Sequence, residues 1–280
     1  MTEGSMNKVR LGRTDLMVTS ICFGTSGIGD MPDTYGYGVD EARARATMHA
    51  IFDGPANFID TSRIYGMGRS EERIGAAIRD RGGLPEGFVV STKLDRDPET
   101  NRFDAAQARR SLEQSLKALG LERVDLLHLH DPEHTSSVDE TLSRDGALGE
   151  LFRMKEEGLA RAIGLAAGVV STMIPLLRDW DFDVLITHNR FTLANRNADA
   201  MLDLAASRGI AVLNAALTPA ACSPRDRPPI RATPIRKLRR KCSIRSGGSK
   251  RSACCMACRP ERRRCSSPCA IPGSPRPSAA

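Results

Sequence analysis

Four ionisable residues have types and spacing that could support proton transfer. Asp60 ends the apolar run NFID, Tyr65 follows shortly after it, Lys93 lies near the end of FVVSTKL, and His130 ends VDLLHLH. A tyrosine hydroxyl has an ordinary pKa near ~10, and a neighbouring ammonium group lowers that pKa because it stabilises the phenolate. A carboxylate would keep the ammonium charged and in place, and a histidine could orient a substrate oxygen. We therefore interpret these four residues as a candidate proton-transfer set.

Each of the four also has a purely structural interpretation. An aspartate after a strand commonly caps a loop, a lysine at a strand end is commonly solvated, and a histidine can be a hydrogen-bonded core residue. His128 shares the inward face of its strand with His130 because side chains alternate along a strand, and we interpret His128 as a packing residue. The chemical hypothesis therefore requires a fold that brings the four side chains together.

Apolar, strand-like runs alternate with helical patterns along the first 216 residues. A short hairpin is expected over residues 9–18. Strands are expected at seven runs: 20–24, 57–60, 88–94, 124–130, 160–166, 183–189 and 210–216. The helical patterns between them include 40–53, 70–79, 104–119 and 147–158, and Asp40, Ser70 and Asp104 are the expected N-caps.

This alternation predicts parallel strands joined by right-handed crossovers. Seven strand–helix units, with an eighth strand expected, favour an α/β fold of the (β/α)8 TIM-barrel type. No GxGxxG follows a strand, which argues against a doubly wound dinucleotide-binding fold. In a barrel, chemistry takes place at the carboxyl ends of the strands, where the four candidate residues are found.

Five stretches of the chain carry a resemblance to a known family. They are KVRLGRTDLMVTSICFGTSGIG, NFIDTSRIYGMGRSEERIGAAI, VVSTKL, RRSLEQSLKALGLERVDLLHLHDPE and GLARAIGLA. In order and spacing they resemble the aldo-keto reductase family over residues 7–216. The stretch LLHLHDPE most resembles the corresponding sequence in the branch that contains L-fucose dehydrogenase and D-threo-aldose 1-dehydrogenase. This resemblance suggests a sugar C1 hydroxyl as the substrate group.

The resemblance implies an oxidoreductase that uses NADP or NAD, without deciding between them. Such an enzyme interconverts a carbonyl or sugar lactone and an alcohol or aldose by direct hydride transfer, without a metal. Tyr65 would be the general acid or base, Lys93 would tune it while held by Asp60, and His130 would orient the carbonyl. The implied partner is a small-molecule carbonyl or sugar substrate.

The resemblance also implies where the cofactor binds. The residues expected to contact it are Gly24, Thr25, Asp60, and Asn189 or Arg190. The family usually has a Ser-Asn pair after its fifth strand to hold the nicotinamide amide, and this chain has Ala166-Ala167 there. We expect the amide to use backbone groups or water at that point.

The amino-acid composition changes near residue 216. This change divides the chain into a barrel-like region, 1–216, and a tail, 217–280. The tail holds 16 of the 41 Lys and Arg residues, two acidic residues, seven of the eight cysteines, ten of the 16 prolines and no aromatic residue. Its net charge is therefore +14, and that of the first region is −7. High charge without aromatic residues predicts a disordered basic tail.

The tail composition also suggests a frameshift. Every cysteine codon begins with TG. In a reading frame that starts at the third base of each present codon, these two bases become the last two of a codon. Every codon that ends in TG encodes Leu, Val or Met. We hypothesise that residues 217–280 are an out-of-frame translation of the last part of a barrel gene. The eighth strand would then not be encoded, the barrel would be incomplete, and the chain could be inactive as written.

The composition of the tail raises two other hypotheses for its function. Clustered Lys and Arg could bind nucleic acid, but the tail has no aromatic side chain for base stacking and no recognised fold motif, which argues against that partner. Zinc binding would use cysteines of the segment 251–269: Cys254, Cys255, Cys258, Cys265 and Cys269. The first pair spacing suits zinc, but the second pair follows too closely for a usual zinc ribbon.

The N-terminal sequence MTEGSMNKVR lacks the apolar segment of a secretory signal. No window approaches the ~18 apolar residues of a membrane helix. A single cysteine in residues 1–216 is typical of a reducing compartment. We therefore expect a cytoplasmic protein with no membrane partner.

Overall fold

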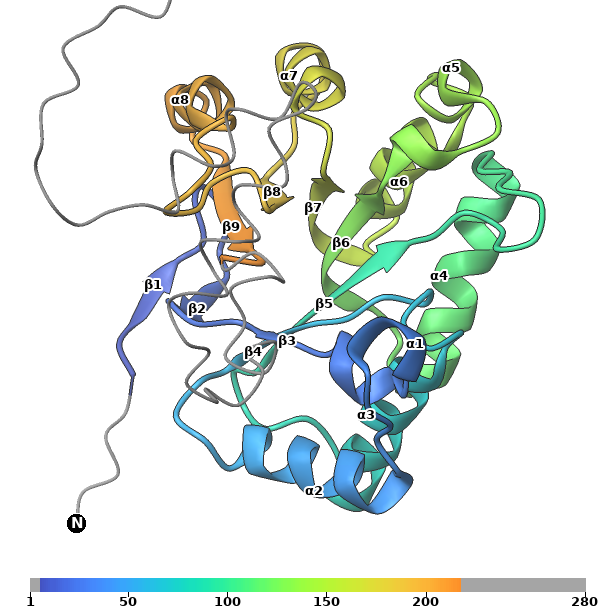
Figure 1. The fold of residues 1–280 in the computed structure, drawn as a ribbon, viewed down its shortest axis with the longest axis vertical. Helices are drawn as coiled ribbons and strands as arrows, with labels where there is room; N and C mark the ends of the chain where they lie inside the picture. The colour runs from blue at the N-terminus through green and yellow to red at the C-terminus, as the bar shows by residue number, and fades with distance from the viewer. Residues whose placement is uncertain (1–5, 218–280) are drawn as a thin grey trace, which may run out of the picture. The chain divides into compact units, whose positions relative to one another are not determined.

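A computed structural model describes residues 6–217 of the chain. Its main sheet has seven strands, all paired in parallel and in sequence order from β3 to β9. The strands are β3 Phe23–Gly24, β4 Phe58–Asp60, β5 Val89–Leu94, β6 Val124–His130, β7 Ala160–Ala167, β8 Val184–His188 and β9 Ala211–Ala215. They curve around a common interior, and the helices lie outside them (Figure 1). The predicted barrel architecture is thus confirmed through its seventh strand.

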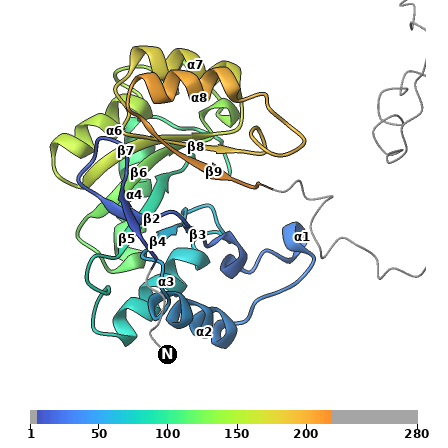
Figure 2. The ribbon, with the colours of Figure 1, turned by 90° about the vertical axis from the view of Figure 1, so that its left-hand side faces the viewer.

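The segments between the strands form the covering helices (Figure 2). The longer ones are α2 Glu41–Phe52, α3 Arg69–Asp80, α4 Ala105–Leu119, α6 Ala147–Glu156, α7 Val170–Asp179 and α8 Asp199–Ser207. The shorter ones are η1 Ser26–Gly29, α1 Pro32–Tyr35, η2 Pro132–His134 and α5 Val138–Thr141. Each crossover contains at least one helix, as parallel strand pairing requires.

Two of the three predicted N-caps are confirmed. The carboxylate of Asp40 accepts a hydrogen bond from the backbone N–H of Arg43, and that of Asp104 accepts one from Gln107, at 2.7 Å in both cases. The prediction for Ser70 was wrong, because α3 begins at Arg69, and its N-cap is Gly68 in a left-handed conformation with φ 95°. A backbone turn that glycine permits, rather than a side-chain cap, therefore starts this helix.

The N-terminal hairpin is also confirmed: β1 Lys8–Arg10 pairs antiparallel with β2 Met17–Thr19. Leu11, Leu16 and Val18 are buried against residues near the beginnings of five parallel strands. Those strand residues are Phe58, Val89, Leu126, Ala162 and Val184. The hairpin therefore covers the end of the sheet interior at which the strands begin, opposite to the end that carries the candidate residues.

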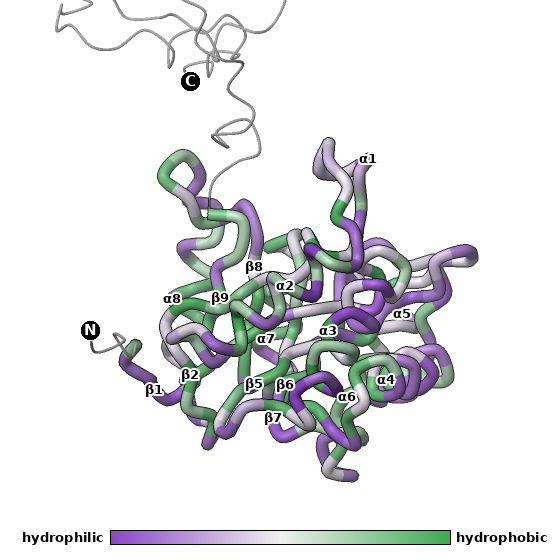
Figure 3. Tube along the Cα trace, turned by 90° about the horizontal axis from the view of Figure 1, so that it is seen from below, coloured by the Kyte–Doolittle hydropathy of each residue, from purple (hydrophilic) through white to green (hydrophobic). Residues whose placement is uncertain are grey.

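A second and larger core lies between the outer face of the sheet and the helices. In Figure 3 the tube is mostly hydrophobic along β9 and the neighbouring strands, and its hydrophilic stretches lie mainly at the periphery. Within residues 6–217, no helix combines the length and apolar composition needed to cross a bilayer. The expected eighth strand, the proposed frameshifted tail and its five candidate zinc ligands all lie outside the described residues.

Candidate active site

The four predicted residues come from three adjacent parallel strands and one loop. Asp60 ends β4, Lys93 is the next-to-last residue of β5, and His130 ends β6. Parallel strands place their carboxyl ends at the same edge of a sheet, and the alternation of side chains turns these three toward the interior. Tyr65 reaches the same edge from the loop between β4 and α3.

Lys93 is the centre of this cluster. Its Nζ lies 2.6 Å from Oδ2 of Asp60, 2.6 Å from the carbonyl oxygen of Thr61 and 3.3 Å from the hydroxyl of Tyr65. Only 2% of its side chain is exposed. Burial disfavours the ammonium ion, but Asp60, Tyr65 and Asp95 together more than offset this, so the pKa of Lys93 is raised above its ordinary value. The lysine therefore stays charged.

Asp60 has both carboxylate oxygens engaged. Oδ2 faces Lys93, and Oδ1 accepts a hydrogen bond of 2.8 Å from the hydroxyl of Ser91 on β5. Ser91 also lies 3.3 Å from Nδ1 of the buried His128. These contacts fix the carboxylate against β5, so it can hold the lysine in one position.

The pKa of Tyr65 differs from the expectation drawn from the sequence. Burial raises this pKa most strongly, the Lys93 ammonium lowers it, and the Asp60 carboxylate raises it again, with a net upward shift. The expected net lowering was wrong, because Lys93 is paired with Asp60 and the hydroxyl is desolvated. Tyr65 is thus protonated at neutral pH and can donate a proton to a substrate oxygen.

His130 has a carboxylate partner that the sequence reasoning missed. Its Nδ1 lies 2.5 Å from Oδ1 of Asp95, which follows β5 and is buried. Its ring meets the Tyr65 ring edge to face, with centroids 6.1 Å apart. The sequence offered one indication of this partner: residue 95 is two positions after Lys93, so its side chain would also point inward if the strand geometry continued past residue 94.

His128 behaves as a packing residue in this fold. It is fully buried, and burial lowers its pKa to about 3, so its ring is neutral. The ring fits against Gly164 on β7, where a Cβ atom would come within 2.4 Å of Cδ2 of His128. The small residue at 164 therefore makes room for the imidazole inside the sheet.

Gly24 and Thr25, two of the expected cofactor contacts, lie beside Asp60. Gly24 pairs with Asp60 across β3 and β4, and a Cβ atom at Gly24 would meet nothing within 4 Å. The backbone N–H and the hydroxyl of Thr25 both donate to the carbonyl oxygen of Asp60, at 3.0 and 2.9 Å. Open space at Gly24 allows a flat group to approach the strand end, whereas Thr25 fixes the loop.

Asn189 and Arg190 are farther along the rim. The Nδ2 of Asn189 lies 3.4 Å from Nδ1 of His188, and the Nε of Arg190 donates to the carbonyl oxygen of Gly168 at 2.6 Å. Among the described residues, neither side chain makes a hydrogen bond to the four catalytic candidates. Arg190 instead ties the loop after β8 to the loop after β7.

Ala166 and Ala167 end β7 and are both buried. Their methyl groups offer no hydrogen bond to an amide. The carbonyl oxygen of Ala166 accepts a hydrogen bond from the backbone N–H of Asp131, and the N–H groups of Gly168 and Val169 donate to Glu133. The backbone groups around the alanine pair are thus already satisfied within the protein.

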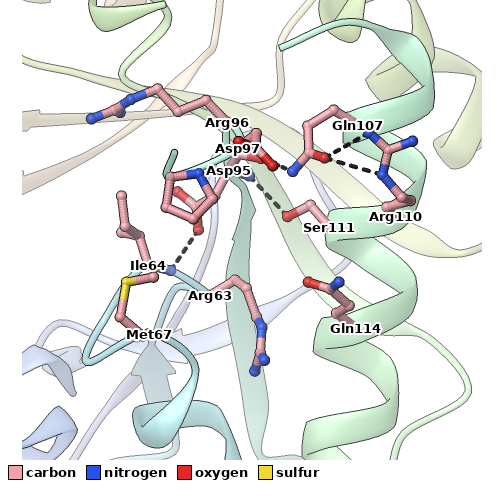
Figure 4. A pocket seen from close by; sticks show the side chains of 11 residues that line it. Arg63, Ile64, Met67, Asp95, Arg96, Asp97, Gln107, Arg110, Ser111 and Gln114 are labelled. Atoms are coloured by element: carbon pink, nitrogen blue, oxygen red, sulfur yellow. Dashed lines mark hydrogen bonds between the residues drawn. The ribbon is translucent and has the colours of Figure 1, made fainter. Parts of the chain in front are cut away.

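A cavity of about 260 Å³ lies behind Asp95, between the loop after β4 and helix α4 (Figure 4). It is lined by Arg63, Ile64, Met67, Asp95, Arg96, Asp97, Pro98, Gln107, Arg110, Ser111 and Gln114. Its arginine side chains diverge in Figure 4, so they do not converge on one anion position. Within residues 6–217, no group of three or more His, Cys, Asp or Glu side chains is arranged to hold a metal ion.

The sequence profile of the Aldo/keto reductase family matches residues 20–223, and the chain belongs to this family. It is 30% identical over 209 residues to an L-galactose dehydrogenase from Arabidopsis thaliana, an alignment that covers 73% of this chain and 63% of that protein. It is also 30% identical over 207 residues to a D-threo-aldose 1-dehydrogenase from a Pseudomonas species, covering 65% of this chain and 60% of the relative. The chain thus spans less than two thirds of these relatives.

A solved structure supports the same family. An aldo-keto reductase structure from Pseudomonas aeruginosa superposes with a TM-score of 0.62 and 29% sequence identity. The match covers 76% of this chain and 80% of the other. The family resemblance seen in the sequence is therefore confirmed, together with the fold it implied.

Proposed function

We propose that this chain carries the active site of an NAD(P)(H)-dependent oxidoreductase, which interconverts a carbonyl or sugar lactone and an alcohol or aldose. The observation that carries the proposal is the contact of one buried ammonium with both a carboxylate and a phenol. Lys93 lies 2.6 Å from Asp60 and 3.3 Å from Tyr65. A lysine placed in this way stabilises a phenolate as it forms.

In carbonyl reduction, Tyr65 donates its proton to the substrate oxygen. The ammonium of Lys93 stabilises the resulting phenolate, and Asp60 keeps the lysine charged and positioned. His130 binds the same substrate oxygen and orients the carbonyl. In alcohol oxidation the proton moves in the opposite direction.

A nicotinamide cofactor, NADP or NAD, would supply or accept the hydride when bound. The open space at Gly24 fits a flat ring beside Asp60. Thr25 would hold the loop under it, and Asn189 or Arg190 would contact it from the other side of the strand ends. Since Ala166 and Ala167 offer only methyl groups and the backbone groups around them already have partners, we expect the amide of the cofactor to bind water there.

The substrate class is proposed from the relatives. One relative is named for L-galactose and another for D-threo-aldoses, and both names describe dehydrogenases. The sugar C1 hydroxyl is therefore the substrate group to test first. The test is to incubate the purified chain, and a version of it with the reading frame restored, with aldoses and NADP or NAD, and to follow the absorbance of the reduced cofactor.

A second proposal concerns the chain as written. The family profile ends at residue 223, close to the change in composition near residue 216. We propose that the tail is a frameshifted product and that the chain lacks activity for this reason. A version with the frame restored after Asn214 should turn over aldoses when the chain as written does not. No turnover by the restored version would contradict the proposed function, and coding DNA without an alternative open frame across residues 214–225 would contradict the frameshift.

A further inference from the structure

The rim of the site beyond His130 carries two polar side chains that the four-residue mechanism leaves unused. Asp131 directly follows β6, and His188 is the last residue of β8. The strand between them, β7, ends in Ala166 and Ala167, whose side chains are short (Figure 1). Oδ1 of Asp131 lies 4.0 Å from Nε2 of His188, so the two side chains face each other over the end of β7.

The position of His188 follows from strand alternation and from a glycine. Val184 at the start of β8 belongs to the interior core, and residues two apart share one face of a strand, so His188 also points inward. Its ring lies against Gly168, where a Cβ atom would come within 2.7 Å of both Cε1 and Nε2. The ring is thus packed on one side, and with 41% of the side chain exposed it remains accessible to a ligand.

Asp131 turns inward because the backbone leaves the strand at this residue. Alternation alone would point residue 131 away from the interior, since His130 points into it. The strand ends at His130, and Asp131 has φ 42°, in the left-handed region that residues other than glycine rarely adopt. Its backbone N–H donates to the carbonyl oxygen of Ala166 at 2.8 Å. The carboxylate consequently lies beside the His130 ring, with Oδ2 3.8 Å from Nε2.

Both distances suit a bridging oxygen atom. A separation of 3.8 or 4.0 Å is too long for a direct hydrogen bond, but an oxygen placed between two such atoms can bond to both. Among the described residues, the Asp131 carboxylate accepts no hydrogen bond and Nε2 of His188 makes none. The neighbouring loops are fixed, because Glu133 accepts from the backbone N–H of Gly168 and Arg190 donates to its carbonyl oxygen.

A hydroxyl group matches this pair better than an ether or carbonyl oxygen does. A carboxylate oxygen can only accept hydrogen bonds, so Asp131 requires a donor. A hydroxyl donates one hydrogen bond and accepts others, whereas the ring oxygen of a cyclic sugar has no hydrogen to donate. A hydroxyl that donates to Asp131 can also accept from Nε2 of His188 when that nitrogen carries a hydrogen.

We propose that Asp131 and His188 form a specificity-determining subsite for the hydroxyl next to the reacting carbon, which is the C2 hydroxyl of an aldose. This inference rests on the proposed function and deepens it: with the reacting oxygen bound by Tyr65 and His130, the neighbouring hydroxyl reaches the next polar side chain along the rim, Asp131. Tyr65 remains the group that transfers the substrate proton. The substrate class is then a 2-hydroxy carbonyl compound or its cyclic form, rather than a simple aldehyde or alcohol.

The subsite is tested first by binding, without turnover. Long-range ¹H–¹⁵N spectra of the full chain resolve the histidine rings, and the variant His188→Gln assigns the signal of His188. We expect L-galactose to shift this signal at a concentration about tenfold lower than 2-deoxy-L-galactose does, because the deoxy sugar lacks the bridging hydroxyl. His134→Gln, at an exposed position on η2, is the matched control and should keep this preference. No preference for L-galactose would overturn the proposal, and a response to NADP or NAD instead would assign the pair to the cofactor.

The second readout is discrimination during turnover by the version of the chain with the frame restored. We expect kcat/KM for L-galactose to exceed that for 2-deoxy-L-galactose by about 10–10²-fold, the usual value of a hydrogen bond to a charged group. Asp131→Asn keeps the shape but loses the charge, and it should lower this ratio about tenfold. The intrinsic reactivity of the two sugars cancels in this comparison between proteins. Asp139→Asn, at an exposed position on α5, is the matched control and should keep the ratio.

The two readouts separate failure of the subsite from failure of the proposed function. Turnover with a ratio near one, or with the same ratio in Asp131→Asn, would overturn the subsite and leave the oxidoreductase standing. Absence of turnover with any aldose, while the His188 signal still prefers L-galactose, would contradict the proposed function and leave the subsite standing.

Discussion

The ammonium of Lys93 lies 2.6 Å from the carboxylate of Asp60, with 2% of one side chain and 16% of the other exposed. An ion pair so little exposed to water costs much desolvation free energy, and this cost is offset only while both charges are present. Thr61 and Ser91 complete the pair, since the first accepts from the lysine and the second donates to the carboxylate. The same two residues therefore stabilise the carboxyl-terminal edge of the sheet and hold the lysine that the proposed chemistry needs.

The variant Asp60→Asn should lower the free energy of unfolding by about 3–5 kcal/mol, because it leaves the Lys93 charge buried without a counter-ion. Urea denaturation measures the change. Asp80→Asn breaks a pair with Arg45 on the surface between α2 and α3 and should cost much less, since that pair is solvated. Equal losses in the two variants would show that burial does not strengthen the Lys93–Asp60 pair.

The variant Tyr65→Phe tests the proton-transfer role. Loss of one hydroxyl should lower kcat about 10²–10⁴-fold, because a positioned general acid contributes a factor of this size. The melting temperature should change little, since the ring remains. Tyr35→Phe removes the hydroxyl of an exposed tyrosine that bonds to Ser26, and it should leave kcat unchanged. The measurement is steady-state oxidation of an aldose by the active form of the chain. Retention of more than a tenth of kcat by Tyr65→Phe would exclude it as the general acid or base.

The part of this site that could be predicted from the sequence is the part governed by strand geometry. Asp60, Lys93 and His130 each stand at the end of an apolar run, and parallel strands bring such ends to one edge. Alternation also put His128 on the same inward face as His130, two residues nearer the start of the strand and therefore deeper in the interior. These relationships depend only on the period of the strand and the direction of the chain.

The part that could not be predicted depends on where loops turn in space. Asp95 contacts His130 because the loop after β4 brings Ser62 and Ile64 back against its carboxylate. The start of α3 depends on the left-handed backbone at Gly68, which no side-chain pattern signals. The pKa of Tyr65 depends on burial, which a list of neighbouring residue types does not contain.

Gly164 is expected to tolerate no side chain. A Cβ atom there would lie 2.4 Å from Cδ2 of His128 and 2.7 Å from the carbonyl oxygen of Val184, and the buried ring has no solvent-filled space into which it can move. Gly164→Ala should therefore lower the free energy of unfolding by about 1–3 kcal/mol, the usual cost of overpacking. Gly24→Ala, where nothing lies within 4 Å, is the control and should lose none. Equal stability of the two variants in urea would mean that β6 and β7 can shift apart at no cost.

Glu71 should make the stability of the chain depend on pH. It is fully buried on α3, its Oε1 accepts a hydrogen bond of 2.6 Å from Thr92, and burial raises its pKa to about 7 from an ordinary value of 4.5, although the hydrogen bond from Thr92 partly offsets this. Between those two pH values the folded chain holds a proton that the unfolded chain releases. The free energy of unfolding therefore falls as the pH rises through this window, by on the order of 3 kcal/mol, and the contribution is flat above it.

The variant Glu71→Gln keeps the shape and removes the titration. Relative to the wild type, its stability should improve from about pH 4.5 to about pH 7, by up to on the order of 3 kcal/mol, and the difference should then stay constant. His128 titrates equally in both proteins, so its effect cancels in the difference. Glu72→Gln, at the exposed neighbouring position, is the matched control for the loss of one charge on α3. Urea denaturation at pH 5 and pH 8 measures all three proteins, and parallel pH curves for the wild type and Glu71→Gln would mean that Glu71 is ionised in the folded state as readily as in the unfolded chain.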